Sequence, residues 1–180
     1  MIDLRKKGLP SQIEVGGLFY AIKTDFREWI KFGEIIKQPF EIYDLAFLFV
    51  ENVPLVVDFT KELLEFYENK NATPNYNDKS SERTLDYILD GEYIVGSFMS
   101  AYGIDLTSVD MHWHLFKALF VSLPDTSKIT QIMGMRSYKK SEESYDKVAL
   151  KNKKAWKLPS IMDSELEQIN QEINDEFYNT

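Results

Sequence analysis

The chain has 180 residues, of which 44% are hydrophobic, so it can bury a sizeable core as one domain or as one domain plus a tail. Its 29 acidic and 21 basic side chains give a net charge of -8, which argues against a protein steered as a whole to DNA or to an anionic membrane. Cysteine is absent, which excludes disulfides and thiolate metal sites, and the longest apolar run, Leu45 to Val50, has six residues where a membrane span needs about 20.

The first predicted elements are a β-hairpin and an amphipathic helix. The hairpin is expected over residues 12–23, because Gly16-Gly17 supplies the positive φ angles of a two-residue turn. Thr24-Asp25 is typical of a helix cap, and the helix is expected from Phe26 to Lys37. Its apolar side is formed by Phe26, Trp29, Ile30, Ile35 and Ile36.

The segment from residue 38 to 56 has a weak hydrophobic periodicity, so helix and strand both stay open there. Asn52-Val53-Pro54 resembles a helix start with proline in the first turn, and a helix is expected from Leu55 to Tyr67. The polar stretch 69–81, which contains Pro74, is predicted to be a loop.

Two further helices are predicted in the middle of the chain. Asp90 caps the first, which runs to Tyr102 and ends at Gly103. Ser108 caps the second, over residues 109–123, which is apolar enough to lie at the centre of a core. The predicted core contains Trp29, Ile30, Leu63, Phe98, Trp113, Phe116 and Phe120.

Two helices are predicted before the last segment. Thr126 starts a short helix that ends near Gly134. Ser141 caps another over residues 142–157, and Leu158-Pro159 breaks it.

A final acidic helix is expected from Asp163 to about Phe177. The predicted fold class is therefore mainly α, with a compact multi-helix domain, a short N-terminal β-hairpin and a C-terminal helical arm. The compact domain is placed at residues 1–158 and the acidic arm at 159–180.

No pattern in the sequence indicates catalysis. His112 and His114, the only histidines, are two apart on a predicted helix and so point about 200° apart, which does not suit one metal ion. We expect both to be structural. There is no Gly-rich phosphate loop and no serine elbow, although a carboxylate pair that meets only in space stays open. We therefore expect no enzyme activity, no cofactor and no bound metal.

The last forty residues carry opposite charges on two predicted helices. A basic stripe on the first helix consists of Lys147, Lys151 and Lys154. The acidic final helix has a narrow apolar stripe of Leu166, Ile169, Ile173 and Phe177. The residues of both stripes are candidate protein-binding residues. Alternatively, the basic residues form a solvated face and the apolar residues a packed one. The final helix either folds back on the basic one or forms a detachable arm.

Three segments resemble one family. They are 24–32 (TDFREWIKF), 101–119 (AYGIDL running into MHWHLFKAL) and 132–137 (IMGMRS). In this order and spacing they resemble the gene-product-15 family of tailed phages and prophages of Gram-positive bacteria, over roughly residues 10–157.

The resemblance implies a role in building a long non-contractile tail. Members are typically encoded beside the tape-measure protein and are considered tail assembly chaperones, which coat its apolar helices, recruit tail-tube subunits and then leave. The expected partners are therefore the tape-measure protein and the tail-tube protein, with self-association along a long client. The expected location is the host cytoplasm and not the mature virion, and neither nucleic acid nor membrane is an expected partner.

The alternative function is a structural component of the tail, such as a completion or connector protein, which would stay in the virion. An acidic DNA mimic is less well supported, because basic residues interrupt the acidic ones outside the last segment. An enzyme is less well supported still, because no catalytic pattern is found.

Overall fold

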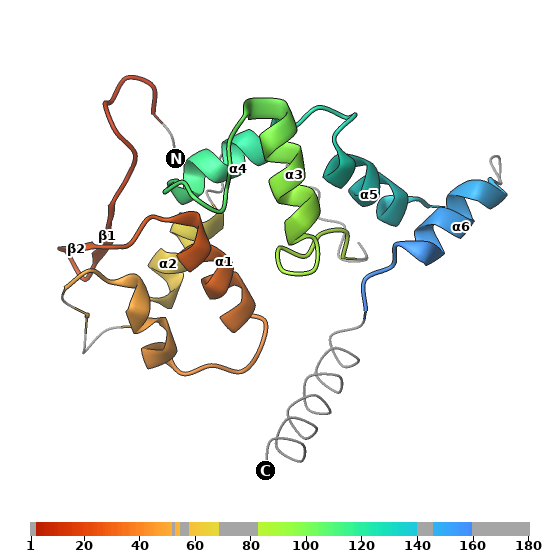
Figure 1. The fold of residues 1–180 in the computed structure, drawn as a ribbon. Coiled ribbons are helices and arrows are strands. Elements are labelled where there is room, and N and C mark those ends of the chain that lie inside the picture. Colours follow the sequence, from red (N-terminus) through yellow and green to blue (C-terminus); the bar gives the residue numbers. More distant parts are fainter. Residues whose placement is uncertain (1–2, 52, 55–57, 69–82, 140–145, 160–180) are drawn as a thin grey trace, which may run out of the picture. The chain divides into compact units, whose positions relative to one another are not determined.

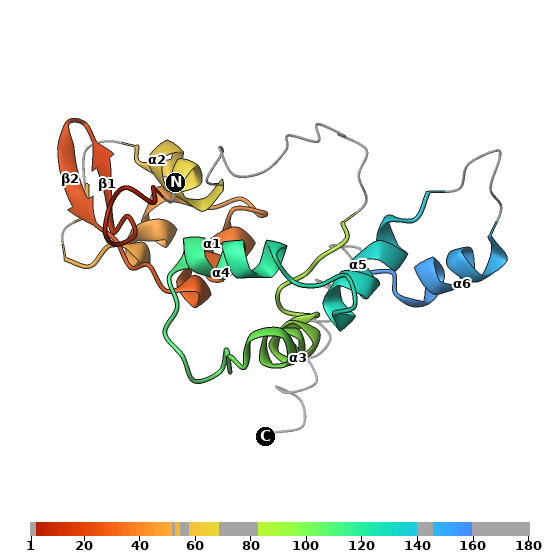
Figure 2. The same ribbon diagram turned by 90° about the horizontal axis from the view of Figure 1, so that it is seen from above.

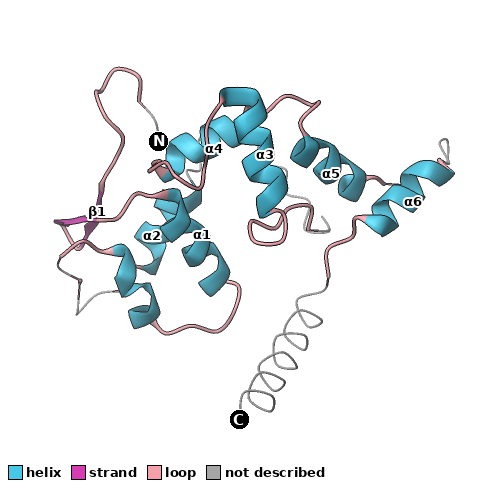
Figure 3. Cartoon of the chain, in the orientation of Figure 1, coloured by secondary structure: helices cyan, strands magenta, loops and turns pink. Residues whose placement is uncertain are grey.

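The computed structural model describes residues 3–51, 53–54, 58–68, 83–139 and 146–159. Helices make up most of the regular structure, and two strands near the N-terminus pair with each other (Figures 1 and 3). The predicted class, mainly α with an N-terminal β-hairpin, is confirmed. The elements are β1 (Gln12–Val15), β2 (Leu18–Ala21), α1 (Phe26–Ile35), the 3₁₀ helix η1 (Ile42–Leu48), α2 (Thr60–Glu68), α3 (Gly91–Tyr102), α4 (Trp113–Val121), α5 (Lys128–Ser137) and α6 (Lys147–Ala155).

The chain divides into two compact units. Unit 1 spans Met1–Asn77 and Val95–Ser127, and unit 2 spans Asp78–Ile94 and Lys128–Thr180. The division falls inside α3. The boundary that the sequence places at residue 158 stays a prediction, because residues 160–180 lie outside the described part of the chain.

The hairpin of unit 1 closes as its sequence predicts. Val15 pairs with Leu18, and the two glycines between them have φ angles of 60° and 82°, a backbone that favours glycine. Asp25 caps α1 by accepting a hydrogen bond from the amide of Arg27 at 3.0 Å. The helix ends at Ile35, two residues before the predicted end.

The segment for which the hydrophobic periodicity allowed either helix or strand folds as η1 followed by an extended stretch. Leu45 and Leu48 are fully buried and lie three residues apart, which is one turn of a 3₁₀ helix. The amide of Lys23 donates to the carbonyl of Leu48 at 2.7 Å, and the amide of Val50 donates to the carbonyl of Ala21 at 3.1 Å. The stretch after η1 is therefore paired with the end of β2 and the residues that follow it.

Helix α2 begins at Thr60, five residues later than the predicted Leu55. Residues 55–57 lie outside the described part of the chain, and the carboxylate of Asp58 accepts a hydrogen bond from the amide of Thr60 at 2.8 Å. The helix packs against β1 (Figure 2). The predicted loop over 69–81 also lies outside the described residues.

Aromatic side chains fill the core of unit 1. The predicted core residues that are at most 1% exposed are Trp29, Leu63, Phe98, Trp113 and Phe116. The rings of Phe98 and Phe116 stack with their centroids 5.3 Å apart. The prediction is wrong for Ile30 and Phe120, which are only half-buried. Ile30 is turned by about 100° around α1 from the buried Trp29, at the margin of the inner face.

Helix α4 begins at Trp113, four residues after the predicted start, and Ser108 does not cap it. His112 is the N-cap, with an extended backbone at φ -63° and ψ 136°. The reason is long-range pairing: the amide of Phe26 donates to the carbonyl of Met111 at 2.9 Å, and the amide of Trp113 donates to the carbonyl of Thr24 at 2.7 Å. This pairing keeps the residues before Trp113 out of the helix.

A buried ion pair organises unit 2. Nη1 and Nη2 of Arg136 donate to the two carboxylate oxygens of Asp90 at 2.6 and 2.9 Å. Arg136 also donates to the carbonyl oxygens of Trp156 at 2.6 Å and Thr84 at 3.0 Å. Asp90 precedes α3 as predicted, but its side chain accepts from Arg136 and from the amide of Asp86. The ion pair thus joins three segments of unit 2, which contain Asp90, Arg136 and Trp156.

The last described helix, α6, packs on α5 and begins at Lys147, after the predicted start at residue 142. Asp146 is its N-cap and accepts hydrogen bonds from the amides of Val148 and Ala149. Residues 140–145 lie outside the described part of the chain. The helix ends at Ala155, shortly before Leu158-Pro159 as predicted.

Gly33 of α1 provides a test of the aromatic packing. A Cβ there would lie 2.5 Å from the hydroxyl of Tyr67, whose ring contacts those of Trp113 and Phe32 at 5.1 and 5.2 Å. We expect Gly33→Ala to destabilise unit 1 by about 1–3 kcal/mol, although this change usually favours a helix. The matched control is Gly96→Ala in α3, where nothing lies within 4 Å of the new Cβ, and it should stabilise by about 0.5–1 kcal/mol. Urea unfolding measures both, and a stabilised Gly33→Ala would contradict the prediction.

The ion pair of unit 2 provides a second test. Arg136→Met should lower the free energy of unfolding by about 3–5 kcal/mol, because Asp90, 1% exposed, would stay buried without its cation. Lys37→Met is the control, since it breaks the exposed pair of Lys37 with Glu34 and should cost less than about 1 kcal/mol. Denaturant titration followed by circular dichroism compares the two, and equal small losses would show that the buried pair contributes little.

Candidate protein-binding site at the hairpin edge

The outer edge of β2 is only partly paired. The amide of Ile22 points toward β1 and donates to the carbonyl of Ser11 at 3.0 Å, whereas the carbonyl of Ala21 points the other way and accepts from Val50. Because the hydrogen-bonding direction alternates along a strand, the amide and carbonyl of Phe19 also point away from β1. None of the described residues pairs with Phe19 on that side. Among the described residues, the edge is therefore open next to Phe19.

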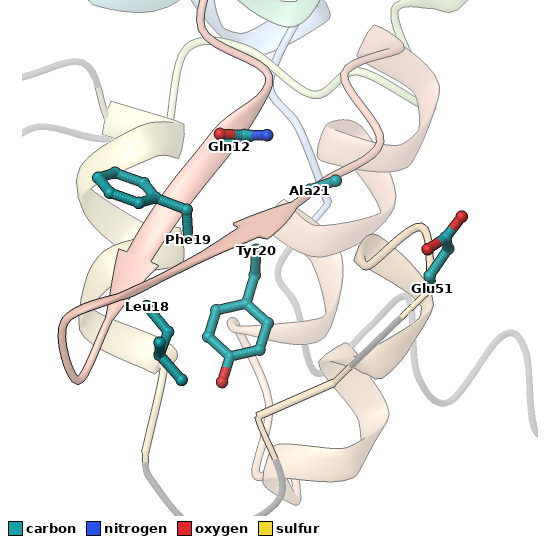
Figure 4. A pocket seen from close by; sticks show the side chains of 6 residues that line it. All are labelled: Gln12, Leu18, Phe19, Tyr20, Ala21 and Glu51. Carbon is teal, nitrogen blue, oxygen red and sulfur yellow. The ribbon is translucent and has the colours of Figure 1, made fainter.

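Large apolar side chains surround this open edge. Leu18 is 63% exposed and Phe19 is 69% exposed. They belong to opposite faces of the hairpin, since Leu18 and Tyr20 share a side of the strand while Phe19 points to the other (Figure 4). A hollow of about 480 Å³ follows the edge and is lined by Gln12, Leu18, Phe19, Tyr20, Ala21 and Glu51.

The hairpin holds this surface in a fixed position. Ile13 and Val15 of β1 are 7% and 2% exposed, so one face of the hairpin is packed into unit 1. The ring of Tyr20 meets that of Phe49 edge-on, with centroids 6.2 Å apart, and Phe49 in turn meets Phe59 at 4.9 Å. An exposed edge on a fixed hairpin can add a further extended segment and cover its apolar side chains.

The sequence reasoning found the hairpin but missed this surface. The available signal was the run Leu18-Phe19-Tyr20, three large apolar residues in a two-stranded hairpin. Successive side chains of a strand point to opposite faces, so a hairpin that buries one face must expose at least one member of such a run.

The predicted protein-binding residues lie elsewhere. Lys147, Lys151 and Lys154 are exposed on one stripe of α6 in unit 2. Val148 of the same helix is 65% exposed. The other predicted residues, which lie outside the described part of the chain, are Leu166, Ile169, Ile173 and Phe177. Their role in binding stays a prediction.

The two histidines lie closer together than predicted. Their ring centroids are 5.1 Å apart, because His112 precedes α4 and does not belong to it. Nδ1 of His112 accepts from the amide of His114 at 3.0 Å, so its proton is on Nε2, which lies 2.8 Å from the carbonyl of Pro10. Among the described residues, no group of three or more His, Asp or Glu side chains could hold a metal ion.

His114 and Lys117 bind the end of α2. Nε2 of His114 lies 2.8 Å from the carbonyl of Phe66, and Nζ of Lys117 donates to the carbonyls of Tyr67 and Glu68 at 2.8 and 2.9 Å. Burial lowers the pKa of His114 to about 4, and the hydrogen bond to Phe66 opposes this shift. Burial also lowers the pKa of Lys117, against the attraction of Glu68. Both side chains therefore contact the last carbonyl groups of α2.

The family model of the bacteriophage Gp15 proteins matches residues 6–158. The chain belongs to this family. The resemblance of the three sequence segments is thus confirmed, and the Gp15 chain is a phage structural or morphogenesis protein. None of the curated proteins and none of the solved structures matches it. In the described part of the chain, no helix has the length and apolar character needed to cross a membrane.

His114 gives this Gp15 protein a pH-dependent stability. Its pKa is about 4 in the folded chain against an ordinary 6.5, so between these values the unfolded chain binds a proton that the folded chain does not. The free energy of unfolding should fall as the pH falls from 6.5 to about 4, by up to roughly 3 kcal/mol. His114→Gln can still donate to Phe66 and should lack this loss.

The control for this prediction is His112→Asn, which keeps a side chain able to cap α4 and should keep most of the loss. Urea titrations at several pH values measure the difference between each variant and the unmodified chain. An identical pH dependence in His114→Gln and in the unmodified chain would contradict the prediction.

Proposed function

We propose that this Gp15 protein is a non-enzymatic tail assembly chaperone that binds the tape-measure protein and recruits tail-tube subunits. Family membership supports a role in phage morphogenesis. The observation that carries the finer proposal is the open edge of β2 with Leu18 and Phe19 beside it. Such an edge suits a client with apolar side chains that must be kept from aggregating.

The two exposed side chains provide the affinity. Burying a large apolar side chain gives roughly 1.5–3 kcal/mol, so Leu18 and Phe19 together contribute roughly 3–6 kcal/mol to binding before the cost of association. The backbone of Phe19 pairs only with an extended segment. The client segment is therefore extended where it crosses β2, and its apolar side chains contact both faces of the hairpin.

The same proposal gives the protein its place in assembly. The chaperone acts in the host cytoplasm, coats the tape-measure protein as several copies and is released before the virion is complete. Its buried ionisable groups support a role without catalysis, since His114 and Lys117 bind carbonyls of α2 and Arg136 binds Asp90. Nucleic acid and membrane have no part in the proposal.

The decisive experiment is co-expression with the tape-measure protein of the same phage. The unmodified chain should keep that protein soluble and co-purify with it. Leu18→Ser/Phe19→Ser should reduce the co-purified amount by roughly tenfold or more, because it removes two apolar contacts. The matched control is Ile88→Ser/Leu89→Ser in unit 2, which removes two residues of similar exposure, 66% and 53%, and should leave binding unchanged.

Thermal unfolding shows whether each double variant is folded. Equal binding by the hairpin variant and the unmodified chain would contradict the proposed site. A tape-measure protein that stays insoluble beside abundant folded Gp15 protein would contradict the chaperone function. Mass spectrometry of purified virions then tests the structural alternative, which requires the protein to remain in the particle.

A further inference from the structure

The hollow beside β2 has a carboxylate at one end. Glu51 is one of the residues that line it, and its side chain is exposed. The preceding residue fixes its position, because the amide of Val50 donates to the carbonyl of Ala21 at 3.1 Å. Figure 4 shows Glu51 beyond Ala21, whereas Leu18 and Phe19 lie toward the other end of the strand. The hollow thus connects an apolar end to an acidic one.

A second carboxylate lies on the outer face of the hairpin. Glu14 of β1 is exposed and is the partner of Phe19 in the antiparallel register, so both side chains point to the same face. Neither Glu14 nor Glu51 forms a salt bridge with another described residue. Lys23, the first basic residue after β2, is exposed four residues beyond Phe19. The two carboxylates favour basic partners, as does the net charge of -8.

Binding at the apolar end changes the environment of Glu51. A client segment that lies along the edge and covers Leu18 and Phe19 also removes water from part of the hollow. A carboxylate that loses water without gaining a cation or a hydrogen-bond donor opposes binding, whereas a lysine or arginine of the client compensates the loss. The apolar contacts therefore give a general affinity, and the charge beside them decides which segments are accepted.

The geometry also limits where the basic residue lies in the client. Neighbouring residues of an extended segment are about 3.3 Å apart, so Phe19 and Ala21 are separated by about 6.6 Å along β2. Glu51 is reached at the Ala21 end. A client residue that pairs with Phe19 is therefore about two to four positions away from the one that faces Glu51.

We propose that Glu51 makes the hairpin edge selective for extended segments that carry a lysine or arginine about two to four residues from a large apolar residue. This inference rests on the proposed function of the edge as a client-binding site, and it adds the chemistry of the client. Segments of similar apolar content with an acidic residue in that place are rejected, because Glu51 and Glu14 repel them.

Two synthetic peptides test the selectivity. Both consist of about ten residues, leucine and serine alternately, which is long enough to cross a strand. They differ at one central serine, which is replaced by lysine in one peptide and by glutamate in the other. Fluorescence anisotropy should show that the lysine peptide binds roughly tenfold more tightly at low ionic strength, since an attraction replaces a repulsion. The preference should decrease at about 1 M salt, where the screening length is about 3 Å.

Variants of the full chain assign the preference to Glu51. Glu51→Lys should reverse the order of the two peptides, and Glu51→Gln should reduce the preference without reversing it. The matched control is Glu65→Lys, which makes the same change of charge at an exposed carboxylate of α2 and should leave the ratio of affinities within about twofold. Leu18→Ser/Phe19→Ser should weaken both peptides by a similar factor and leave the ratio unchanged.

Equal affinities of the two peptides, or an unchanged preference in Glu51→Lys, would overturn the inference and leave the client-binding function in place. Binding of neither peptide to the unmodified chain would also overturn it, and so would an equal change in Glu51→Lys and Glu65→Lys, which would mean a general effect of net charge. The proposed function fails by a different result, a tape-measure protein that stays insoluble beside the unmodified chain. Circular dichroism checks folding, and Glu51→Gln decides if Glu51→Lys is unfolded.

Discussion

Side chains of α4 bind the last carbonyl groups of α2, and the arrangement of unit 1 depends on this contact. Trp113 donates to the carbonyl of Tyr67 at 3.0 Å, His114 lies against that of Phe66, and Lys117 reaches Tyr67 and Glu68. The final turn of a helix has no partners of its own for these groups, and a cation there also complements the helix dipole. Leaving the carbonyls buried without donors would cost more than one hydrogen bond each. The only two histidines in the sequence therefore lie close together for a reason of folding, since His112 caps the helix that carries His114.

The start of α4 is in turn linked to the residues that follow the hairpin. Because the residues before Trp113 are extended and pair with residues 24–26, α4 starts at Trp113 and presents its side chains to α2. That pairing places the start of α1, and the stretch after η1 pairs with residues 21–23. The positions of residues 21–23 and 24–26 are thus determined by long-range hydrogen bonds. The edge near Phe19 lies beyond the hydrogen bond from Val50 to Ala21, which is the last one that the described residues form along this side of β2.

The elements that the sequence predicted well are those whose determinants are local. Gly16-Gly17, the Asp25 cap and the stop at Gly103, where φ is 67°, each act within a few residues. The start of α4 and the 3₁₀ helix η1 could not be predicted, because backbone pairing and the burial of Leu45 and Leu48 determine them from outside the segment. For the candidate site the hairpin was predictable, while the exposure of Leu18 and Phe19 depends on how the rest of unit 1 packs around the hairpin. The role of Arg136 was hidden for the same reason, since its carboxylate partner lies 46 residues away.

Basic residues that look alike in the sequence separate into two kinds in unit 2. Arg136 is 6% exposed and donates hydrogen bonds to Asp90 and to two carbonyl oxygens. It therefore stabilises the unit and offers little charge to a ligand. Lys147, Lys151 and Lys154 of α6 are exposed, and their charge acts on solvent and on other molecules. A charge reversal at Arg136 would therefore change folding before it changed binding, whereas one at the exposed Lys157 changes mainly the surface charge. Since the apolar edge belongs to unit 1, variants of these lysines in unit 2 leave the residues of the edge untouched.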